Sequence, residues 1–308
     1  MELKLASLNQ TVEVILILVT GCTGFLGSAL VKSLLESGHT VRGLARHGGP
    51  FKDDSITGVD VVHGSILEPE TLAHAMEGVD RVIHLVGILV ETKGQTFSEV
   101  HHQGTKNVLQ AAQDANVKRY LQISSMGTRP DAISRYHQSK WLAEEAVRNS
   151  GLEVTIFRPS VIFGPYDAFT TIFAKMARYS PILPLLGDGN NRMQPIWVGD
   201  MAQFVSKALD DPQTIGETYE LGGPEQLTFR AIIEEIIKAT NRRSTMLPIP
   251  LPILRFQANL FEKFHPKPPL TSDQLIMAQE DNVTEQHPWS LYDIDPIPFT
   301  VGIRSYLS

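Results

Sequence analysis

The chain is poor in cysteine and lacks both long apolar runs and clusters of basic residues. Its 308 residues include one cysteine, which excludes an internal disulfide framework and a cysteine-based metal cluster. The apolar run VEVILILVTG is too short to span a bilayer and ends in a glycine turn, as a buried parallel strand does. The formal net charge is −7, so neither nucleic acid nor an anionic membrane is expected as the main partner. We therefore expect a small-molecule substrate and assign no metal ligands.

The first ten residues, MELKLASLNQ, also lack the features of a targeting segment. They contain an acid and have neither arginine-rich nor long apolar character, so we expect neither a transit peptide nor a secretory signal. Together with the single cysteine, this favours a reducing, cytoplasmic location.

Short β-branched runs alternate with helical stretches from Val14 to about Gly164. The runs VILILV, RVIHLVG and VTIFRPSVIFG are separated by stretches such as TKNVLQAAQDA. This alternation predicts an α/β fold, a doubly wound parallel sheet of the Rossmann type with helices on both faces. We expect a dinucleotide-binding domain over 12–164 and a small C-terminal substrate lobe over 165–308, some segments of which return to the sheet. The lobe is expected to be irregular because proline and glycine are frequent after Gly164.

The stretch VTGCTGFLGSAL joins the first predicted strand to the first helix. Gly21 permits a tight turn, Gly24 lets the backbone approach a pyrophosphate, and Gly27 permits close packing of helix on strand. The amides of the first helical turn then face the phosphates. The residues that we predict to bind a dinucleotide here are Gly21, Thr23, Gly24, Phe25, Leu26 and Gly27.

The end of the second predicted strand bears on the choice of nucleotide. In HTVRGLARHGG, Ala45 stands where an acid would hold an adenosine ribose, and Arg46 follows. An arginine at this position can bind the 2′-phosphate of NADP(H). The sequence favours NADP(H) with Arg46 as the phosphate partner, and NAD(H) is the alternative if Arg46 is only a solvated surface residue.

In SRYHQSK, Tyr136 and Lys140 are four residues apart and share one face of a predicted helix. A phenol with a pKa near 10 is a poor base at neutral pH and needs nearby positive charge. We predict that Tyr136 transfers a proton and that Lys140 supplies the charge. Glu144, one turn farther on, is predicted to be a surface ion-pair partner.

The glycine loop, preceded by Thr20, and the Tyr136–Lys140 pair after the fifth strand resemble extended and atypical short-chain dehydrogenase/reductases. The resemblance implies that Ser125, in LQISSMG, is the catalytic hydroxyl and that Lys140 also holds the nicotinamide ribose. It further implies that residues after the other strands line the nucleotide. These are Ser65 and Ile66, then Leu85, Val86 and Gly87, then Pro159 and Val161.

Arg192 lies in RMQPIWVGDMA, which is similar to a pattern of the extended members. The resemblance implies that Arg192 binds an anionic group of the substrate. The alternative is an arginine that braces a loop.

Four longer blocks are similar to bacterial relatives of the short-chain-dehydrogenase-like accessory subunit of respiratory complex I. They are RYHQSKWLAEEAVRNSGLEVTIFRPSVIFGP, MQPIWVGDMA, ETYELGGPEQLTFRAI and PPLTSDQL. The resemblance leaves two hypotheses open: an NADP(H)-dependent oxidoreductase or epimerase-like enzyme, or a non-catalytic NADPH-binding structural or assembly protein. The mitochondrial member generally lacks the catalytic tyrosine, whereas this chain keeps Tyr136, Lys140 and Ser125, which favours the enzyme.

Segment 250–265 carries an apolar helical face. If the chain is helical from Ile253 onward, Ile253, Phe256, Leu260 and Phe264 share that face, with Leu254 and Phe261 on its flank. The first interpretation is that the face caps the substrate cleft or packs on the core. The second is a peripheral membrane contact that gives a quinone or a prenylated substrate access to the cofactor.

Overall fold

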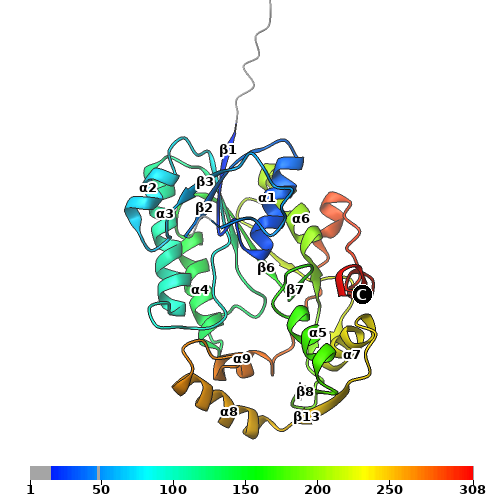
Figure 1. Cartoon of the computed structure of the whole chain (residues 1–308). Helices are drawn as coiled ribbons and strands as arrows, with labels where there is room; N and C mark the ends of the chain where they lie inside the picture. The colour runs from blue at the N-terminus through cyan, green and yellow to red at the C-terminus, as the bar shows by residue number, and fades with distance from the viewer. Residues whose placement is uncertain (1–14, 47–48, 308) are drawn as a thin grey trace, which may run out of the picture.

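The centre of the molecule is a seven-stranded sheet in which every strand is parallel to its neighbours. The computed structural model describes residues 15–46 and 49–307 (Figure 1). The strand order is β11-β6-β5-β4-β1-β2-β3. The strands are β1 (Leu16–Thr20), β2 (Thr40–Ala45), β3 (Asp60–His63), β4 (Arg81–His84), β5 (Arg119–Ile123), β6 (Glu153–Pro159) and β11 (Thr218–Leu221). This topology confirms the predicted doubly wound α/β fold.

Helices cover both faces of the sheet (Figure 1). On one face lie α1 (Phe25–Glu36) and α6 (Val198–Asp210). On the other lie α2 (Pro69–Ala75), η1 (Ser98–Gln103), α3 (Gly104–Asp114) and α4 (Arg135–Arg148).

Strand β1 shows why its sequence is an unbroken apolar run. Ile17 and Val19 pack into the core beneath α1 and α6, whereas Leu18 packs into the core on the opposite face. Successive side chains of a strand point to opposite faces. A strand covered on both sides therefore has to be apolar at every position, which is the unbroken run seen in the sequence.

The order of the strands also fixes where a ligand can bind. The chain runs outward from β1 through β2 to β3, then returns to place β4 on the other side of β1. In open parallel sheets, the crevice at such a reversal, beyond the carboxyl ends of the strands, accepts ligands. The loops after β1, β4 and β5 meet at this crevice, and they carry the predicted glycine turn, the segment Leu85–Gly87 and Ser125.

The C-terminal lobe is built from short two-stranded pairings and from helices packed around them (Figure 1). Its strands pair as β7 (Ile162–Phe163) with β10 (Ile196–Trp197), β8 (Ile182–Leu186) with β13 (Thr245–Ile249), and β9 (Arg192–Met193) with β12 (Leu227–Thr228). Its helices are α5 (Thr170–Tyr179), α7 (Phe229–Ala239), α8 (Leu251–Phe264), α9 (Ser272–Met277), α10 (Phe299–Gly302) and α11 (Arg304–Leu307).

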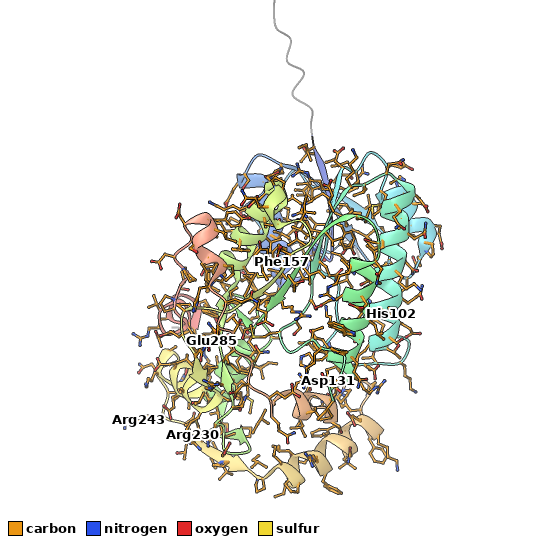
Figure 2. All side chains as sticks on the ribbon, turned by 180° about the vertical axis from the view of Figure 1, so that it is seen from behind. His102, Asp131, Phe157, Arg230, Arg243 and Glu285 are labelled. Atoms are coloured by element: carbon orange, nitrogen blue, oxygen red, sulfur yellow. The ribbon has the colours of Figure 1, made fainter. Side chains whose placement is uncertain are left out.

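Two separate cores hold the lobe together. The larger surrounds Phe163 and Phe299, between α5, α7 and the last helices. Thr228 caps α7 by accepting a hydrogen bond from the backbone N–H of Ala231, at 3.1 Å. Figure 2 shows Phe157 within the central sheet and Arg230 and Arg243 at the far end of the lobe.

The apolar face of α8 does not pack on the core, so this part of the first interpretation of segment 250–265 was wrong, whereas a role in capping the substrate cleft stays a prediction. Ile253, Phe256, Leu260 and Phe264 are 51%, 70%, 47% and 71% exposed. The helix instead packs through Leu254 and Ala258 against α9, where its main partner is Leu275. Because α9 is only six residues long, it covers one stripe of α8 and leaves the neighbouring stripe uncovered.

Candidate active site

The glycine loop after β1 adopts the conformation that its sequence predicted. Gly21 has a positive φ of 77°, which favours glycine, and its carbonyl accepts a hydrogen bond from Gly24 N–H at 3.0 Å. A Cβ atom added to Gly27 would lie 2.1 Å from the carbonyl oxygen of Gly21. The loop can therefore close against α1 only with glycine at position 27.

The first turn of α1 leaves its amides available to a ligand. Within the described residues, no side chain caps this helix, whose N-cap residue is Gly24. Thr23, Phe25 and Leu26 lie around this turn, and Phe25 approaches Gly164 across the crevice. Uncapped amides at a helix N-terminus bind phosphate oxygens.

A cavity of about 360 Å³ lies at the carboxyl ends of β2, β3 and β4. It brings together five predicted residues from three different loops: Arg46, Ser65, Ile66, Val86 and Gly87. Leu85 and Val86 also contact the Gly21 turn, because a Cβ atom there would lie 3.6 Å from Leu85 Cβ and 3.3 Å from Val86 Cγ2. The cavity runs along the carboxyl ends of the strands, where the adenosine half of a dinucleotide would lie.

Lys140 is buried beside the loop that follows β4. Its Nζ donates a hydrogen bond to the carbonyl oxygen of Ile123, at 3.2 Å, and lies 3.2 Å from where a Cβ atom of Gly87 would be. Burial lowers the pKa of Lys140 to about 8, and the negative charge of Glu144 opposes that shift. Near neutral pH the ammonium is therefore present at the bottom of the crevice.

Tyr136 is also buried, one helical turn before Lys140. Burial raises the pKa of the phenol, and a hydrogen bond with the Ser125 side chain opposes that shift. The sequence suggested that nearby positive charge would lower the pKa of this phenol. In the structure burial has the larger effect and raises the pKa, so the phenol stays protonated at neutral pH and is suited to donate a proton.

The structure reveals His101 as a site residue that the sequence did not indicate. Its Nε2 accepts a hydrogen bond from Ile88 N–H at 2.9 Å, which leaves the proton on Nδ1 to be donated to Ser139 Oγ at 2.7 Å. Ser139 in turn donates to the carbonyl oxygen of Tyr136 at 2.7 Å. His101 thus links the loop after β4 to the helix of Tyr136, and two adjacent histidines in a helical stretch gave no signal of this.

A second unpredicted residue, Asp273 of α9, fixes the start of the same helix. Its carboxylate accepts hydrogen bonds from Arg135 N–H at 2.7 Å, from Tyr136 N–H at 3.2 Å and from the Ser134 hydroxyl at 2.9 Å. An acid at a helix N-terminus is favourable. The signal in the sequence was the capping box around Thr271, which marks the start of α9 but not its partner.

Glu144 is fully buried, so its prediction as a surface ion-pair partner was wrong. It bonds to the Ser124 hydroxyl at 2.6 Å, to Arg158 Nε at 2.9 Å and to Arg148 Nη2 at 2.6 Å. The reason is that α4 lies flat on the sheet at this point, so its inward face meets the polar end of β6. Glu144 ties the helix of Tyr136 to the loop that carries Ser124 and Ser125.

The remaining predicted residues lie at the border with the lobe. Pro159 O accepts a hydrogen bond from Met126 N–H at 3.0 Å, and Val161 O accepts one from Ile196 N–H at 2.9 Å. Arg192 forms an ion pair with Asp281, at 2.9 Å from both Nε and Nη2. That pairing matches the loop-bracing alternative for Arg192.

The residues present fit an NAD(P) dinucleotide. The first turn of α1 has no side-chain cap, and the glycines at 24 and 27 let the loop close tightly against it, so its amides form a cradle for a phosphate. The missing side chain of Gly87 leaves room beside the Lys140 ammonium. The pyrophosphate would lie at α1, and the nicotinamide ribose at Lys140.

Comparisons with known proteins agree with this geometry. Residues 17–222 match the model of the NAD dependent epimerase/dehydratase family. The chain is 29% identical to NADH dehydrogenase (ubiquinone) 1 alpha subcomplex subunit 9, mitochondrial, of Arabidopsis thaliana, over 94% of this chain and 76% of that protein. It is 34% identical to the ceramide reductase of Caulobacter vibrioides, over 60% of this chain and 57% of that protein.

A solved structure, UDP-glucose 4-epimerase of Thermotoga maritima with UDP-glucose, superposes with a TM-score of 0.75. It covers 95% of this chain and 97% of its own, at 18% identity, so it supports the fold alone. The matched family model spans every strand of the central sheet, from β1 to β11. The chain therefore belongs to the NAD dependent epimerase/dehydratase family.

Proposed function

We propose that the protein is an NADP(H)-dependent reductase of a carbonyl compound, with Tyr136 as the proton donor. The observation that carries the proposal is the buried, protonated Tyr136, which lies near the Ser125 side chain and one turn before Lys140 at the nucleotide crevice. A relative named as a reductase supports it. Within the oxidoreductase and epimerase-like activities of this family, a raised phenol pKa favours reduction, because reduction of a carbonyl consumes a proton.

The residues divide the chemistry among them. A bound nicotinamide supplies the hydride. The Ser125 hydroxyl donates a hydrogen bond to the carbonyl oxygen of the substrate, and Tyr136 gives its proton to that oxygen while the carbonyl carbon accepts the hydride. The products are an alcohol and a phenolate, which the Lys140 ammonium stabilises until water returns the proton.

The test is a screen of ketones, quinones and sugar nucleotides for oxidation of NADPH. We expect at least one carbonyl class to turn over. If no compound oxidises NADPH faster than it does with the Tyr136→Phe variant, the proposal fails.

The other candidate is a structural or assembly protein that holds NADPH without reacting. The Arabidopsis relative, named as a subunit of NADH dehydrogenase, favours it. A bound cofactor stabilises the fold whether or not it reacts. Cofactor binding alone therefore does not separate the two candidates, whereas turnover does.

The preference for NADP(H) over NAD(H) rests on Arg46. Arg46 is exposed at the rim of the cavity that also contains Ser65 and Ile66. We expect the wild type to bind NADPH more tightly than NADH, and Arg46→Ala to weaken NADPH binding by about tenfold while changing NADH binding little. Fluorescence titration measures both. Arg243→Ala, at the far end of the lobe, is the matched control, and equal wild-type affinities for the two cofactors would overturn the preference.

We also propose that segment 250–265 places the protein at a membrane surface. Residues 242–267 contain five basic side chains and one acidic one, in a chain whose net charge is −7. The acid, Glu262, is turned toward α9, where it accepts hydrogen bonds from Ser272. The exposed apolar stripe of α8 is thus accompanied by cations, the pattern that binds anionic bilayers. No helix in the described ranges is long and apolar enough to cross a bilayer.

Flotation with vesicles of phosphatidylcholine and phosphatidylglycerol measures this contact. We expect the wild type to float and Phe256→Ser with Phe264→Ser to lose at least about tenfold in vesicle binding, because each apolar ring is withdrawn from the interface. Val301→Ser, an equally exposed apolar residue elsewhere in the lobe, is the control. A wild type that stays wholly in the soluble fraction would contradict the proposal.

A further inference from the structure

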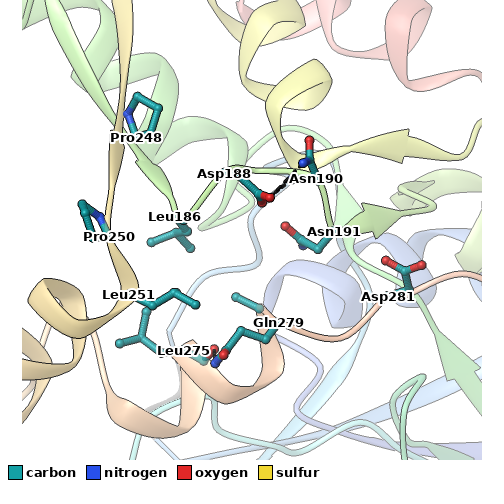
Figure 3. A pocket seen from close by; sticks show the side chains of 12 residues that line it. Leu186, Asp188, Asn190, Asn191, Pro248, Pro250, Leu251, Leu275, Gln279 and Asp281 are labelled. Atoms are coloured by element: carbon teal, nitrogen blue, oxygen red, sulfur yellow. Dashed lines mark hydrogen bonds between the residues drawn. The ribbon is translucent and has the colours of Figure 1, made fainter.

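A second cavity, of about 660 Å³, lies within the C-terminal lobe (Figure 3). We call it the lobe cavity. It is bounded by the β8–β13 pair, by the turn 187–191, and by α8 and α9. Its volume is in the range of cavities that bind small organic ligands.

The lobe cavity has one apolar wall and one polar wall (Figure 3). Leu186, Leu251 and Leu275 form the apolar wall together with two prolines at the end of β13. The polar wall carries Asp188 and Asn191. A ligand that satisfies both walls has an apolar part and a separate polar part.

The charges of the polar wall disfavour an anion. Asp188 and Asp281 both line the lobe cavity, and none of its lining residues is basic. Arg192 is held by Asp281. Two further arginines lie behind the lining: Arg230 donates to the carbonyl oxygen of Asp188 at 3.0 Å, and Arg255 donates to Gln279 Oε1 at 3.3 Å. The hydrogen bond from Arg192 N–H lowers the pKa of Asp281, which stays ionised at neutral pH. A nucleoside diphosphate would face two carboxylates here.

An uncharged polar group has a partner at the same wall. The Asp188 carboxylate accepts hydrogen bonds from Asn190 N–H at 3.0 Å and from Asn190 Nδ2 at 2.8 Å, and its remaining lone pairs can accept one from a hydroxyl or an amide N–H of a ligand. Within the described residues the Nδ2 atom of Asn191 has no hydrogen-bond partner, but protein atoms cover it, so it is not itself open to the cavity.

The lobe cavity adjoins the catalytic helix through α9. Leu275 and Ala278 line the cavity, and Asp273 of the same helix bonds to Tyr136 N–H at 3.2 Å. At about 1.5 Å per residue, Leu275 lies about 3 Å farther along the helix axis than Asp273. A chain-like substrate whose carbonyl reaches Tyr136 can thus extend its remainder along α9 into the cavity.

We propose that the lobe cavity binds the chain of an uncharged amphiphilic substrate, with alkyl carbons against Leu186, Leu251 and Leu275 and a hydroxyl or amide N–H at Asp188. The proposal rests on the proposed carbonyl reduction for its link to Tyr136. It distinguishes this chain from a sugar-nucleotide enzyme, because the carboxylates of Asp188 and Asp281 would repel a diphosphate.

The experiment is a fluorescence titration of the full chain with an uncharged dansyl-labelled dodecyl amide, and with UDP as competitor. We expect saturable binding of the probe that UDP does not displace. Ala278→Phe, which fills the cavity from α9, is expected to weaken probe binding by at least about tenfold. Leu142→Phe, on the exposed side of α4, is the matched control, and NADPH binding verifies the fold of each variant.

A second variant keeps the proposal testable if Ala278→Phe does not fold. Asp188→Asn removes one carboxylate and is expected to raise the affinity for dansyl-dodecanoate, the anionic analogue, several-fold. Absence of saturable binding, displacement of the probe by UDP, or unchanged binding in both variants would overturn the proposal. These titrations measure binding and involve no turnover. A carbonyl screen without activity would therefore contradict the proposed reduction but not binding in the lobe cavity. Absence of probe binding would contradict the cavity proposal but not the reduction of short carbonyl compounds.

Discussion

Replacing Tyr136 with phenylalanine is expected to lower the turnover of the carbonyl substrate by about a thousandfold, within the range of general acid catalysis. Binding of NADPH should change little, because the phenol is not among the groups that form the cradle at α1. Tyr136 is buried against Phe97 and His101, which contact it edge to face at centroid distances of 5.7 and 5.2 Å. The phenylalanine ring keeps these contacts, so the loss would reflect the missing proton rather than a displaced helix.

The control is Tyr120→Phe, which removes a hydroxyl from an equally buried tyrosine on β5. That hydroxyl donates to Gln122 at 3.2 Å, away from Ser125 and Lys140. Tyr120→Phe should keep wild-type turnover. If Tyr136→Phe also keeps wild-type turnover, Tyr136 does not donate the proton, and the result favours the structural or assembly protein that holds NADPH without reacting.

The pH profile of the same reaction reports on Lys140. Its pKa is about 8, so the ammonium is present below pH 8 and is lost as pH rises through that value. In the proposed reaction this charge stabilises the phenolate, and we therefore expect the rate to fall above about pH 8 in the wild type. In Lys140→Met the rate should be low at every pH, without this fall.

The sequence was sufficient for the fold and for the part of the site that lies in strand-end loops. Gly21, Ser125 and Tyr136 each follow a strand whose apolar run is visible, and parallel strands bring their carboxyl ends together. Placing these residues at one crevice therefore required only the order of elements along the chain.

The sequence was insufficient wherever a role depends on a partner far along the chain. Asp273 caps α4 from 137 residues away, and nothing near either residue indicates the other. For α8, periodicity identified the apolar stripe correctly, but whether that stripe is covered depends on the length of α9. Amphipathicity shows which side of a helix is apolar, but it does not show which element, if any, packs against that side.

Glu144→Ala is expected to destabilise the protein more than any other single change to α4. Arg158 has a side chain that is only 16% exposed, and its guanidinium bonds to Glu144 through Nε and Nη2 at 2.9 and 2.6 Å. Removing the carboxylate leaves a largely buried cation with its principal partner gone. Breaking a buried ion pair in this way costs about 3–5 kcal/mol of unfolding free energy.

Thermal unfolding followed by circular dichroism measures the change, which should lower Tm by roughly 10 °C for a chain of this size. Glu145→Ala is the matched control on the next residue: its ion pair with Arg148 is exposed to solvent, so the expected loss is less than about 1 kcal/mol. Equal losses in the two variants would show that burial does not strengthen the Glu144 network.

A double variant separates the charge from the packing. In Glu144→Leu with Arg158→Leu, no buried charge of this pair is left without its partner, and apolar side chains fill the space. Such replacements are often neutral or stabilising, so we expect the double variant to unfold at a higher temperature than Glu144→Ala. Turnover should still fall, because the Ser124 hydroxyl loses its 2.6 Å bond to Glu144 and the adjacent Ser125 is then held less firmly against Tyr136.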